Sequence, residues 1–486
     1  MGPTHSAGTR PGAAPKPPLV LLCLVAALLP PACGTPPDRA SDGRPNERRP
    51  NIVYIMADDL GYADLSGYGR TNYSTPALDA LASEGTRFTQ AYAIAPVCTP
   101  TRVGLMTGRY PARNRAGLWE PLRSAFREEG LDAAAPTLAR RLRDAGYQTG
   151  LVGKWHLGLE PRFWPDRHGF DRWFVTLSGG ADYVLHRSSE PGNPAGDHAL
   201  YQDGMAIRKD GYLTDLFTEG AEAFIRSAKP PFFLNLEYTA PHWPWQQRGD
   251  AAYPDDMLPT DGGSPATYAG MMKALDEGVA RVLAALKEAG YADNTIVLFT
   301  SDNGGETYSD MGGLAGMKTQ LWEGGIRVPA FVRWPGSVPA GRTTEQVATT
   351  LDWTATMLAA AGVTGVPELD GMNLLPHLRG DAPVAERTVF WRSNRWGVQH
   401  ALRQGHWKYL RIDTPQARAP RRDTGEFLFD LQNDPREMQN LAAAQPEVLD
   451  RLRRLYAEWD RSVLPAIEPV TAPPRRGADI TRTAVP

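Results

Sequence analysis

The sequence predicts an α/β fold with a large mixed, mostly parallel central sheet flanked by helices, and a smaller C-terminal α+β domain with an antiparallel sheet and a packed helix. Two observations support this prediction. Short continuous apolar runs alternate with helical segments up to about residue 380, as in buried parallel sheets. Beyond that point, Trp-rich and Phe-rich segments such as 387–391 and 400–411 are separated by turn residues, which is typical of antiparallel pairing.

The elements are expected from apolar periodicity, taken in chain order. Each expected strand is a short apolar run that ends at polar residues: 52–56, 147–152, 232–238 and 295–301. Helices are expected over 136–145 and 268–289. A last helix begins with Pro446 and carries, on the face that should pack on the small sheet, Leu449, Leu452, Leu455 and Trp459. Since ligands of open α/β sheets bind outside the carboxyl ends of the strands, the polar residues after the strands should meet in one site.

Length and charge limit the functions that the chain can have. With 486 residues and 42% hydrophobic residues, it exceeds a single small module and can bury a large core. Its 52 basic and 55 acidic residues leave a net charge of -3, so we expect no nucleic-acid partner. We divide the chain into a signal segment (1–33), a linker (34–50), a catalytic domain (51–380), a C-terminal subdomain (381–465) and a loose tail (466–486).

The N-terminal segment is typical of an export signal. Arg10 and Lys16 precede the apolar stretch 19–29, which is too short to be a transmembrane span. Two outcomes stay open: cleavage near Ala32, or lipid modification of Cys33 as in bacterial lipoproteins. We therefore expect an exported protein of bacterial origin that is periplasmic, secreted or an outer-membrane lipoprotein. Because the chain has only three cysteines, no disulfide framework is expected.

Cys98 is the sharpest candidate for chemistry. Pro100 suits a first helical turn, so Cys98 should lie at a helix N-terminus, where the helix dipole and free N–H groups favour an anion. Arg102, one turn later, adds a fixed positive charge. These residues alone indicate a thiolate nucleophile or an anion site, and the alternative is a cysteine that acts as a small core hydrophobe.

A metal site and a set of cationic groups are expected around this cysteine. Asp58 and Asp59 follow one expected strand, and Asp302 and Asn303 follow another. This all-oxygen set favours a hard cation such as Ca²⁺ or Mg²⁺ over Zn²⁺, although an Asp pair after a strand can also be a cap or a turn. The polar residues that complete the set could hold a tetrahedral anion and protonate a leaving oxygen: Lys154, His156, His242 and Lys318. Taken singly, each could equally be a surface charge or a structural histidine.

The segment Cys98-x-Pro100-x-Arg102, with Met106-Thr-Gly-Arg-Tyr-Pro111 after it, resembles the signature of the type I, formylglycine-dependent sulfatases. Five further blocks resemble this arylsulfatase-like family of the alkaline phosphatase superfamily, in family order: 51–61, 153–158, 301–305, 316–318 with 323–329, and 428–437. The resemblance extends over nearly everything from about 50 to 465. It implies hydrolysis of sulfate esters and a maturation enzyme that oxidises Cys98 to formylglycine.

The resemblance also implies residue roles. One calcium ion would be held by Asp58, Asp59, Cys98 in its modified form, Asp302 and Asn303. Formylglycine would hydrate to a geminal diol, and one hydroxyl would attack sulfur to give a sulfated enzyme. Arg102 and Lys154 would hold the formylglycine oxygens, and His242 and Lys318 would bind the sulfate and protonate the departing alcohol. His156 would take a proton from the second hydroxyl, so that sulfate leaves.

The substrate is expected to be a sulfated small molecule or glycan, with a sulfated carbohydrate favoured. Substrate contacts are expected from the residues of two segments: Ser178, Asp182, His186 and Trp243. Trp243 and Trp245 could equally be core aromatics. A phosphonate monoester or phosphodiester hydrolase of the same superfamily is the main alternative function. A non-catalytic glycan binder and a thiol hydrolase with unmodified Cys98 are further alternatives.

Overall fold

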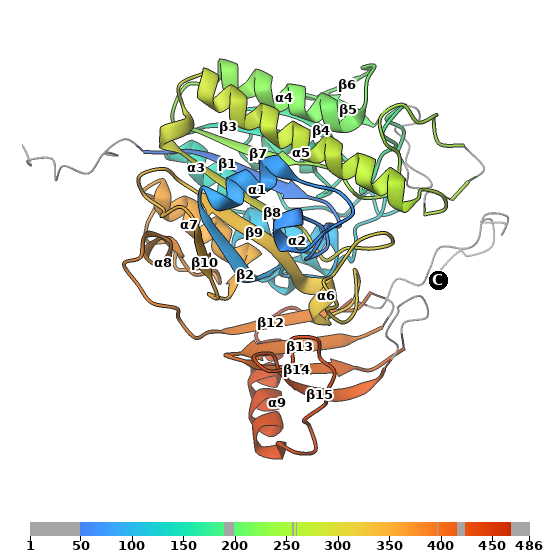
Figure 1. Cartoon of the computed structure of the whole chain (residues 1–486), viewed down its shortest axis with the longest axis vertical. Helices are drawn as coiled ribbons and strands as arrows, with labels where there is room; N and C mark the ends of the chain where they lie inside the picture. The colour runs from blue at the N-terminus through green and yellow to red at the C-terminus, as the bar shows by residue number, and fades with distance from the viewer. Residues whose placement is uncertain are drawn as a thin grey trace, which may run out of the picture. The chain divides into compact units, whose positions relative to one another are not determined.

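The computed structural model describes residues 49–188, 199–254, 257–258, 260–395, 397–415 and 423–467, which belong to one compact unit (Figure 1). The predicted signal segment with Cys33 lies outside the described residues, as do most of the linker and of the tail. Within the described part, none of the helices has the length and apolarity that crossing a bilayer requires.

A mixed sheet of eleven strands forms the centre of the large domain. Its strands are β1 (Asn51–Ala57), β2 (Thr86–Tyr92), β3 (Gln148–Lys154), β4 (Arg172–Thr176), β5 (Leu200–Gln202), β6 (Met205–Ile207), β7 (Phe232–Glu237), β8 (Thr295–Ser301), β9 (Arg327–Arg333), β10 (Arg342–Thr344) and β11 (Ala348–Thr349). Their order is β10-β2-β9-β8-β1-β7-β3-β4-β5-β6, and β11 pairs with β2. The central run β8-β1-β7-β3-β4 is parallel, whereas β9 is antiparallel to both neighbours. The predicted mostly parallel sheet is confirmed.

Both faces of the sheet are covered by helices, which explains why the middle residues of β1 and β8 are apolar on both faces. One face packs against α1 (Pro76–Ser83), α4 (Leu213–Ser227) and α5 (Pro265–Glu288). The other packs against α2 (Cys98–Thr107), α3 (Leu138–Asp144), α7 (Thr350–Ala360) and α8 (Leu375–Arg379). In β1, Val53 and Ile55 join the first core and Ile52 and Tyr54 the second, as the two-residue period of a strand requires. Short 3-10 turns lie in the connections: Ser66–Tyr68, Pro111–Arg113, Arg115–Leu118, Pro161–Phe163, Pro165–His168 and Ala292–Asn294.

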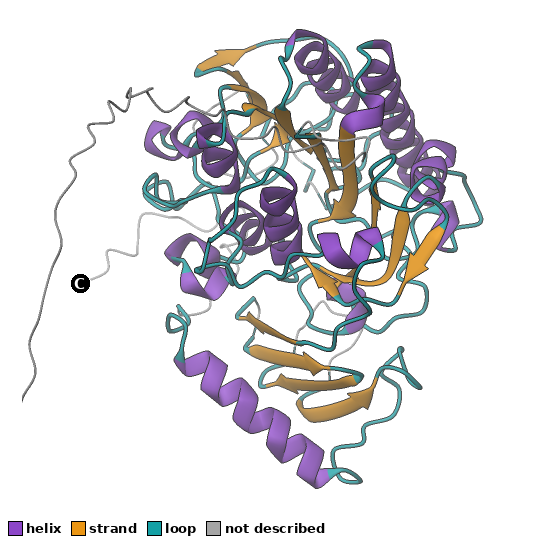
Figure 2. Ribbon diagram, turned by 90° about the vertical axis from the view of Figure 1, so that its left-hand side faces the viewer, coloured by secondary structure: helices purple, strands orange, loops and turns teal. Residues whose placement is uncertain are grey.

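The smaller part is a four-stranded antiparallel sheet with one helix on it (Figure 2). Its strands are β12 (Thr388–Ser393), β13 (Gln399–Gln404), β14 (Trp407–Ile412) and β15 (Gly425–Asp430), and its helix is α9 (Pro446–Arg461). The apolar face of α9 differs in one place from the prediction. Tyr456 is buried and Leu455 only partly buried, because a 3-4-3 spacing from Leu449 follows the helical period more closely.

The small sheet shares its core with the large domain. Its apolar cluster includes Trp391 and Leu402 of the small sheet together with Tyr92 and Trp322, and Trp322 lies just before α6 (Glu323–Ile326). The Trp391 indole N–H also donates to the Ala93 carbonyl over 2.8 Å. The predicted domain boundary near residue 380 stays a prediction.

Candidate active site

Four neighbouring parallel strands end at one edge of the large sheet and bring the predicted polar residues together. β8 leads to Asp302 and Asn303, and β1 to Asp58 and Asp59. β3 ends at Lys154, two residues before His156, and β7 precedes His242. Lys318 arrives from the loop before α6, and all these side chains are buried. The convergence follows from the parallel order, since parallel strands present their carboxyl ends at the same edge.

Cys98 is the first residue of α2, as Pro100 predicts. Its Sγ donates to Asp58 Oδ1 over 3.6 Å. Burial raises the pKa of the Cys98 thiol, although Lys154 and Lys318 act in the opposite direction. The cysteine is therefore enclosed by charged groups, in a place that disfavours an unmodified thiolate.

Carboxylates and cations alternate around Cys98. Lys154 Nζ lies 2.5 Å from Asp58 Oδ2, and Lys318 Nζ lies 2.5 Å from Asp59 Oδ2. Arg102 Nη2 lies 3.0 Å from Asp302 Oδ2. These six residues together with Cys98 and Asn303 are called the Cys98 cluster below.

The oxygen atoms of this cluster fit a hard cation. Asn303 donates its Nδ2 to Asp59 Oδ1 over 2.8 Å, while its buried Oδ1 has no hydrogen-bond partner among the described residues. Ligand atoms of Asp58, Asp59, Cys98 and His242 lie within 4.8 Å of one another. Burial and then the charge of Asp302 raise the pKa of Asp58. A buried amide oxygen without a donor, beside crowded carboxylates, is the donor set that Ca²⁺ prefers.

The two histidines are buried and neutral. His156 Nε2 lies 2.8 Å from the Leu122 carbonyl, and His242 Nδ1 lies 2.6 Å from the Trp243 carbonyl. A carbonyl can only accept, so each of these ring nitrogens carries the proton. Burial and then a neighbouring lysine lower the pKa of each ring, Lys154 for His156 and Lys318 for His242. His242 thereby presents Nε2, as an acceptor, 3.6 Å from Asp59 Oδ2.

Glu237, at the end of β7, completes the surroundings of Arg102. Its Oε2 lies 3.0 Å from Arg102 Nη1, and each side chain is 3% exposed. Burial raises the pKa of Glu237 to about 7, against the opposing charge of Arg102. The sequence interpretation missed this residue, although an acidic side chain inside the apolar run 232–238 was a signal that could have revealed it.

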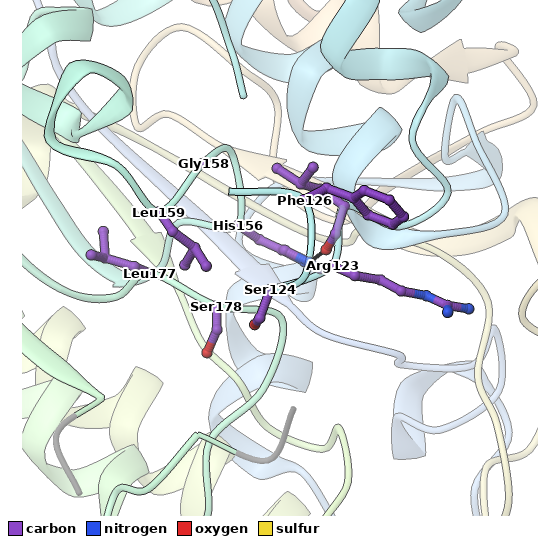
Figure 3. Close-up of a pocket in the computed structure, with 9 residues that line it drawn as sticks. Arg123, Ser124, Phe126, His156, Gly158, Leu159, Leu177 and Ser178 are labelled. Atoms are coloured by element: carbon purple, nitrogen blue, oxygen red, sulfur yellow. Dashed lines mark hydrogen bonds between the residues drawn. The ribbon is translucent and has the colours of Figure 1, made fainter. Parts of the chain in front are cut away.

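The predicted substrate residues lie in different settings. Ser178 lines a small pocket together with His156 and Arg123, whose side chain leaves the loop away from Ser178 (Figure 3). Trp243 is partly buried, with its ring 5.9 Å from Lys318 Nζ, whereas Trp245 belongs to the core. Asp182 and His186 have structural partners. Asp182 accepts backbone N–H groups of its own loop, and His186 Nε2 lies 2.8 Å from the Gly211 carbonyl. Substrate contacts for these residues stay predictions.

Comparison with known proteins identifies the family. A family model described as Sulfatase matches residues 50–363, which is more than half of the chain. The chain belongs to the sulfatase family. A second model, described as N-sulphoglucosamine sulphohydrolase, C-terminal, matches residues 317–459 and so extends over the small sheet and α9.

Individual sulfatases resemble the chain over most of its length. Arylsulfatase J of Mus musculus is 29% identical over 90% of this chain and 80% of its own. N-acetylgalactosamine-6-sulfatase of Homo sapiens is 33% identical over 70% of this chain and 68% of its own. A crystal structure of Ps i-CgsB in complex with k-i-k-neocarrahexaose is 32% identical, with a TM-score of 0.75 over 85% of this chain and 93% of that protein. The chain is a sulfuric ester hydrolase, as the sequence predicts.

Proposed function

We propose that this sulfatase hydrolyses sulfate esters of carbohydrates, with Cys98 converted to formylglycine and one calcium ion in the Cys98 cluster. The observation that carries the proposal is the meeting of four strand ends and the first turn of α2 around Cys98. A sulfate group is a tetrahedral anion, and this place supplies a helix N-terminus and three buried cations for it. The cations are Arg102, Lys154 and Lys318.

The calcium ion would be held by Asp58, Asp59, Asp302 and Asn303, with a further oxygen from the modified residue 98. The orphaned Asn303 Oδ1 and the raised pKa of Asp58 support this assignment. When bound, such an ion supplies positive charge that polarises the oxygen at position 98. An amide beside Asp302, where a two-zinc phosphatase would have a histidine, favours a single hard cation and hence sulfate over phosphate esters.

The remaining side chains would bind the anionic groups and transfer the protons. Arg102 and Lys154, which already bracket Asp58 and Asp302, would hold the oxygens of residue 98. Lys318 and His242 flank Asp59 and would bind the sulfate. Lys318, the charged member of the pair, would supply the proton for the departing alcohol oxygen, and neutral His242 would relay it once its Nε2 is protonated. His156 would accept the proton that must leave residue 98 before sulfate can depart. Its low pKa leaves it neutral and ready to accept.

The carbohydrate assignment rests on what the relatives are named for. One is an N-acetylgalactosamine-6-sulfatase, and one structure contains a neocarrahexaose. We also propose export from a bacterial cell, with Cys33 as the candidate lipid anchor, and a formylglycine-generating enzyme as maturation partner. The N-terminal pattern of Arg10, Lys16 and the apolar stretch supports export.

Peptide mass across Cys98 and turnover of 4-nitrophenyl esters test the proposal together. The protein is expressed in a host that has the maturation enzyme, and the sulfate and phosphate esters are compared. We expect a formylglycine mass and a preference for the sulfate ester that calcium chelation abolishes. Formylglycine with the phosphate or phosphonate ester preferred would support the phosphonate hydrolase instead. Full turnover with unmodified Cys98 would overturn the mechanism.

A further inference from the structure

Glu306 lies next to the Cys98 cluster without taking part in the proposed chemistry. It belongs to the loop that follows Asp302 and Asn303, and its Oε2 lies 4.0 Å from Lys318 Nζ. That oxygen is buried and has no hydrogen-bond partner among the described residues. Buried carboxylate oxygens in folded proteins nearly always have a donor, so this atom requires an explanation.

Lys318 Nζ has two carboxylates within 4.0 Å. Asp59 Oδ2 is 2.5 Å away and accepts a short charged hydrogen bond, whereas Glu306 Oε2 is too far for one. The exposed fraction of the side chain rises from 3% for Asp59 to 9% for Lys318 and 26% for Glu306. Asp59 is therefore the inner partner of the ammonium group, and Glu306 lies on its outer side.

A cation bound in the Cys98 cluster and Lys318 would compete for Asp59. Both need the carboxylate oxygens of Asp59, and two positive charges so close together repel each other. Among the described residues, Glu306 is the other carboxylate within 4.0 Å of Lys318 Nζ. A shift of roughly 1 Å would bring the ammonium group to hydrogen-bond distance of its free oxygen.

Trp243 borders both members of this second pair. Burial raises the pKa of Glu306, while the charge of Lys318 and a hydrogen bond from Trp243 oppose this rise. The centre of the indole ring lies 5.9 Å from Lys318 Nζ and 4.3 Å from the centre of the His242 ring. The Glu306 carboxyl group is thus held beside the two residues that are proposed to bind the sulfate.

We propose that Glu306 is a positioning residue, which takes over the Lys318 ammonium group from Asp59 when the metal site is filled and holds it beside the departing oxygen. The inference rests on the proposed function and deepens it. As the sulfur–oxygen bond breaks, its electron pair goes to the ester oxygen, which takes the proton that Lys318 supplies. Without Glu306, the ammonium group would stay on Asp59 and oppose the cation there.

Calorimetric titration with calcium tests this exchange without any turnover. Glu306→Gln should weaken calcium affinity about 10-fold, because Lys318 loses the charged partner to which it moves. Lys318→Met removes the competitor for Asp59. In that background, Glu306→Gln should therefore change calcium affinity by less than about 2-fold. Equal effects of Glu306→Gln in the two backgrounds would overturn the exchange.

Sulfate esters with different leaving groups test the positioning at saturating calcium. Nitrophenolate leaves readily, whereas the more basic phenolate depends on the proton that Lys318 supplies. Glu306→Gln should lower kcat less than about 3-fold for 4-nitrophenyl sulfate but about 10- to 100-fold for phenyl sulfate, with little change in KM. A purely structural role would lower kcat equally for both esters, and that result would refute the proposal.

The matched control is Glu277→Gln on the surface of α5. Glu277 Oε1 lies 3.9 Å from Lys273 Nζ, a lysine pair of nearly the same length, and both side chains are exposed. This variant should leave calcium affinity and the dependence on the leaving group unchanged. Thermal unfolding checks that the variants fold, and Glu306→Ala takes the place of Glu306→Gln if the latter does not.

Failure of the proposed function would appear in the wild type itself. A converted wild type that binds no calcium, or cleaves no sulfate ester, would contradict that function. A wild type that does both, while Glu306→Gln behaves as Glu277→Gln does, would overturn only the role of Glu306.

Discussion

Two buried clusters of charged side chains in this protein differ in whether they require a ligand. In the Cys98 cluster, burial and the charge of Asp302 raise the pKa of Asp58, and the Asn303 Oδ1 atom has no donor among the described residues. The second cluster, called the Lys408 cluster, consists of Glu323, Lys408, Glu437 and Arg327. Lys408 Nζ lies 3.0 Å from Glu323 Oε1 and 2.8 Å from Glu437 Oε1.

The difference shows that buried charge alone does not mark a functional site. In the Lys408 cluster, Arg327 also lies 3.4 Å from Glu323, and the Tyr92 hydroxyl donates to Glu323 over 2.7 Å. Fixed side chains meet these charges, so the cluster joins α6 to β14 and needs no ligand. The Cys98 cluster has three carboxylates and three cations, but its Asn303 Oδ1 has no donor among the described residues, and a bound cation would complete it. Substitutions should therefore affect activity in one cluster and folding in the other.

The largest expected effect is that of Cys98→Ala on turnover. The variant lacks the group that we propose as the precursor of the nucleophile, so kcat should fall by about four orders of magnitude or more. The fold should persist, because a small apolar side chain replaces a small buried one. Hydrolysis of 4-nitrophenyl sulfate and thermal unfolding measure the two properties. Retention of full activity would contradict the mechanism.

The matching test in the other cluster is Lys408→Met. Removal of the central cation leaves Glu323 and Glu437 buried together, which should lower the free energy of unfolding by about 3–5 kcal/mol. Denaturant unfolding measures this loss. Lys273→Met is the control, because Lys273 is 73% exposed and its pair with Glu277 should contribute less than about 1 kcal/mol. An equal, small change in the free energy of unfolding of both variants would contradict a structural role for the Lys408 cluster.

The pH dependence of the free energy of unfolding is a further test of the Lys408 cluster. Burial raises the pKa of Glu437 to about 7, above the 4.5 of an unfolded glutamic acid, although Lys408 opposes this. The folded state therefore binds more protons between pH 4.5 and 7, and this contribution to stability, on the order of 3 kcal/mol, is lost as the pH rises through that window. Glu437→Gln should flatten that part of the profile. An unchanged slope in the variant would refute the assignment.

Metal retention is the next test of the Cys98 cluster. Asn303→Ala removes the orphaned oxygen, so calcium affinity should fall about 10- to 100-fold. Elemental analysis after dialysis against a calcium-free buffer measures the content. Asn433→Ala, in a turn of the small sheet where Asn433 Nδ2 donates to Asp430, is the control. Equal calcium in both variants would count against Asn303 as a ligand.

The smallest expected effect is that of Glu237→Gln. Glutamine keeps the size of the side chain and an acceptor for Arg102 but removes the charge that holds the guanidinium. We expect kcat to fall about 10-fold with little change in KM, because in the proposed mechanism Arg102 would act on the reacting group and not on the rest of the substrate. A lower melting temperature without a kcat effect would assign Glu237 to stability alone.

Strands that are buried on both faces could be predicted from the sequence. The predicted strand 295–301 coincides with β8, because a strand enclosed on both faces has a continuous apolar run, here residues 296–299. The convergence of Asp58, Lys154 and Asp302 was equally predictable, since it follows from parallel strand order. Sulfatase membership was predictable from short blocks that keep their order along the chain.

Pairings between distant side chains were not predictable. No periodicity in the sequence indicates that Glu237 faces Arg102, or that Glu120 accepts from the turn after β12. Asp182 and His186 were expected at the substrate, but the structure also gives them partners within their own surroundings, which a single sequence does not reveal. Such contacts depend on how separate segments pack, and local propensity carries no information about that.

The burial of Cys98 in the folded chain limits the time during biosynthesis in which its thiol can be modified. Asp302 and Lys318, which close over the cysteine, are translated about 200 residues after it. At roughly 5–20 residues per second, the ribosome needs about 10–40 s for that stretch. Conversion of the thiol, as proposed here, thus competes kinetically with synthesis and folding of the rest of the chain. Slower synthesis, or a host that keeps the precursor unfolded until export, should raise the yield of mature enzyme.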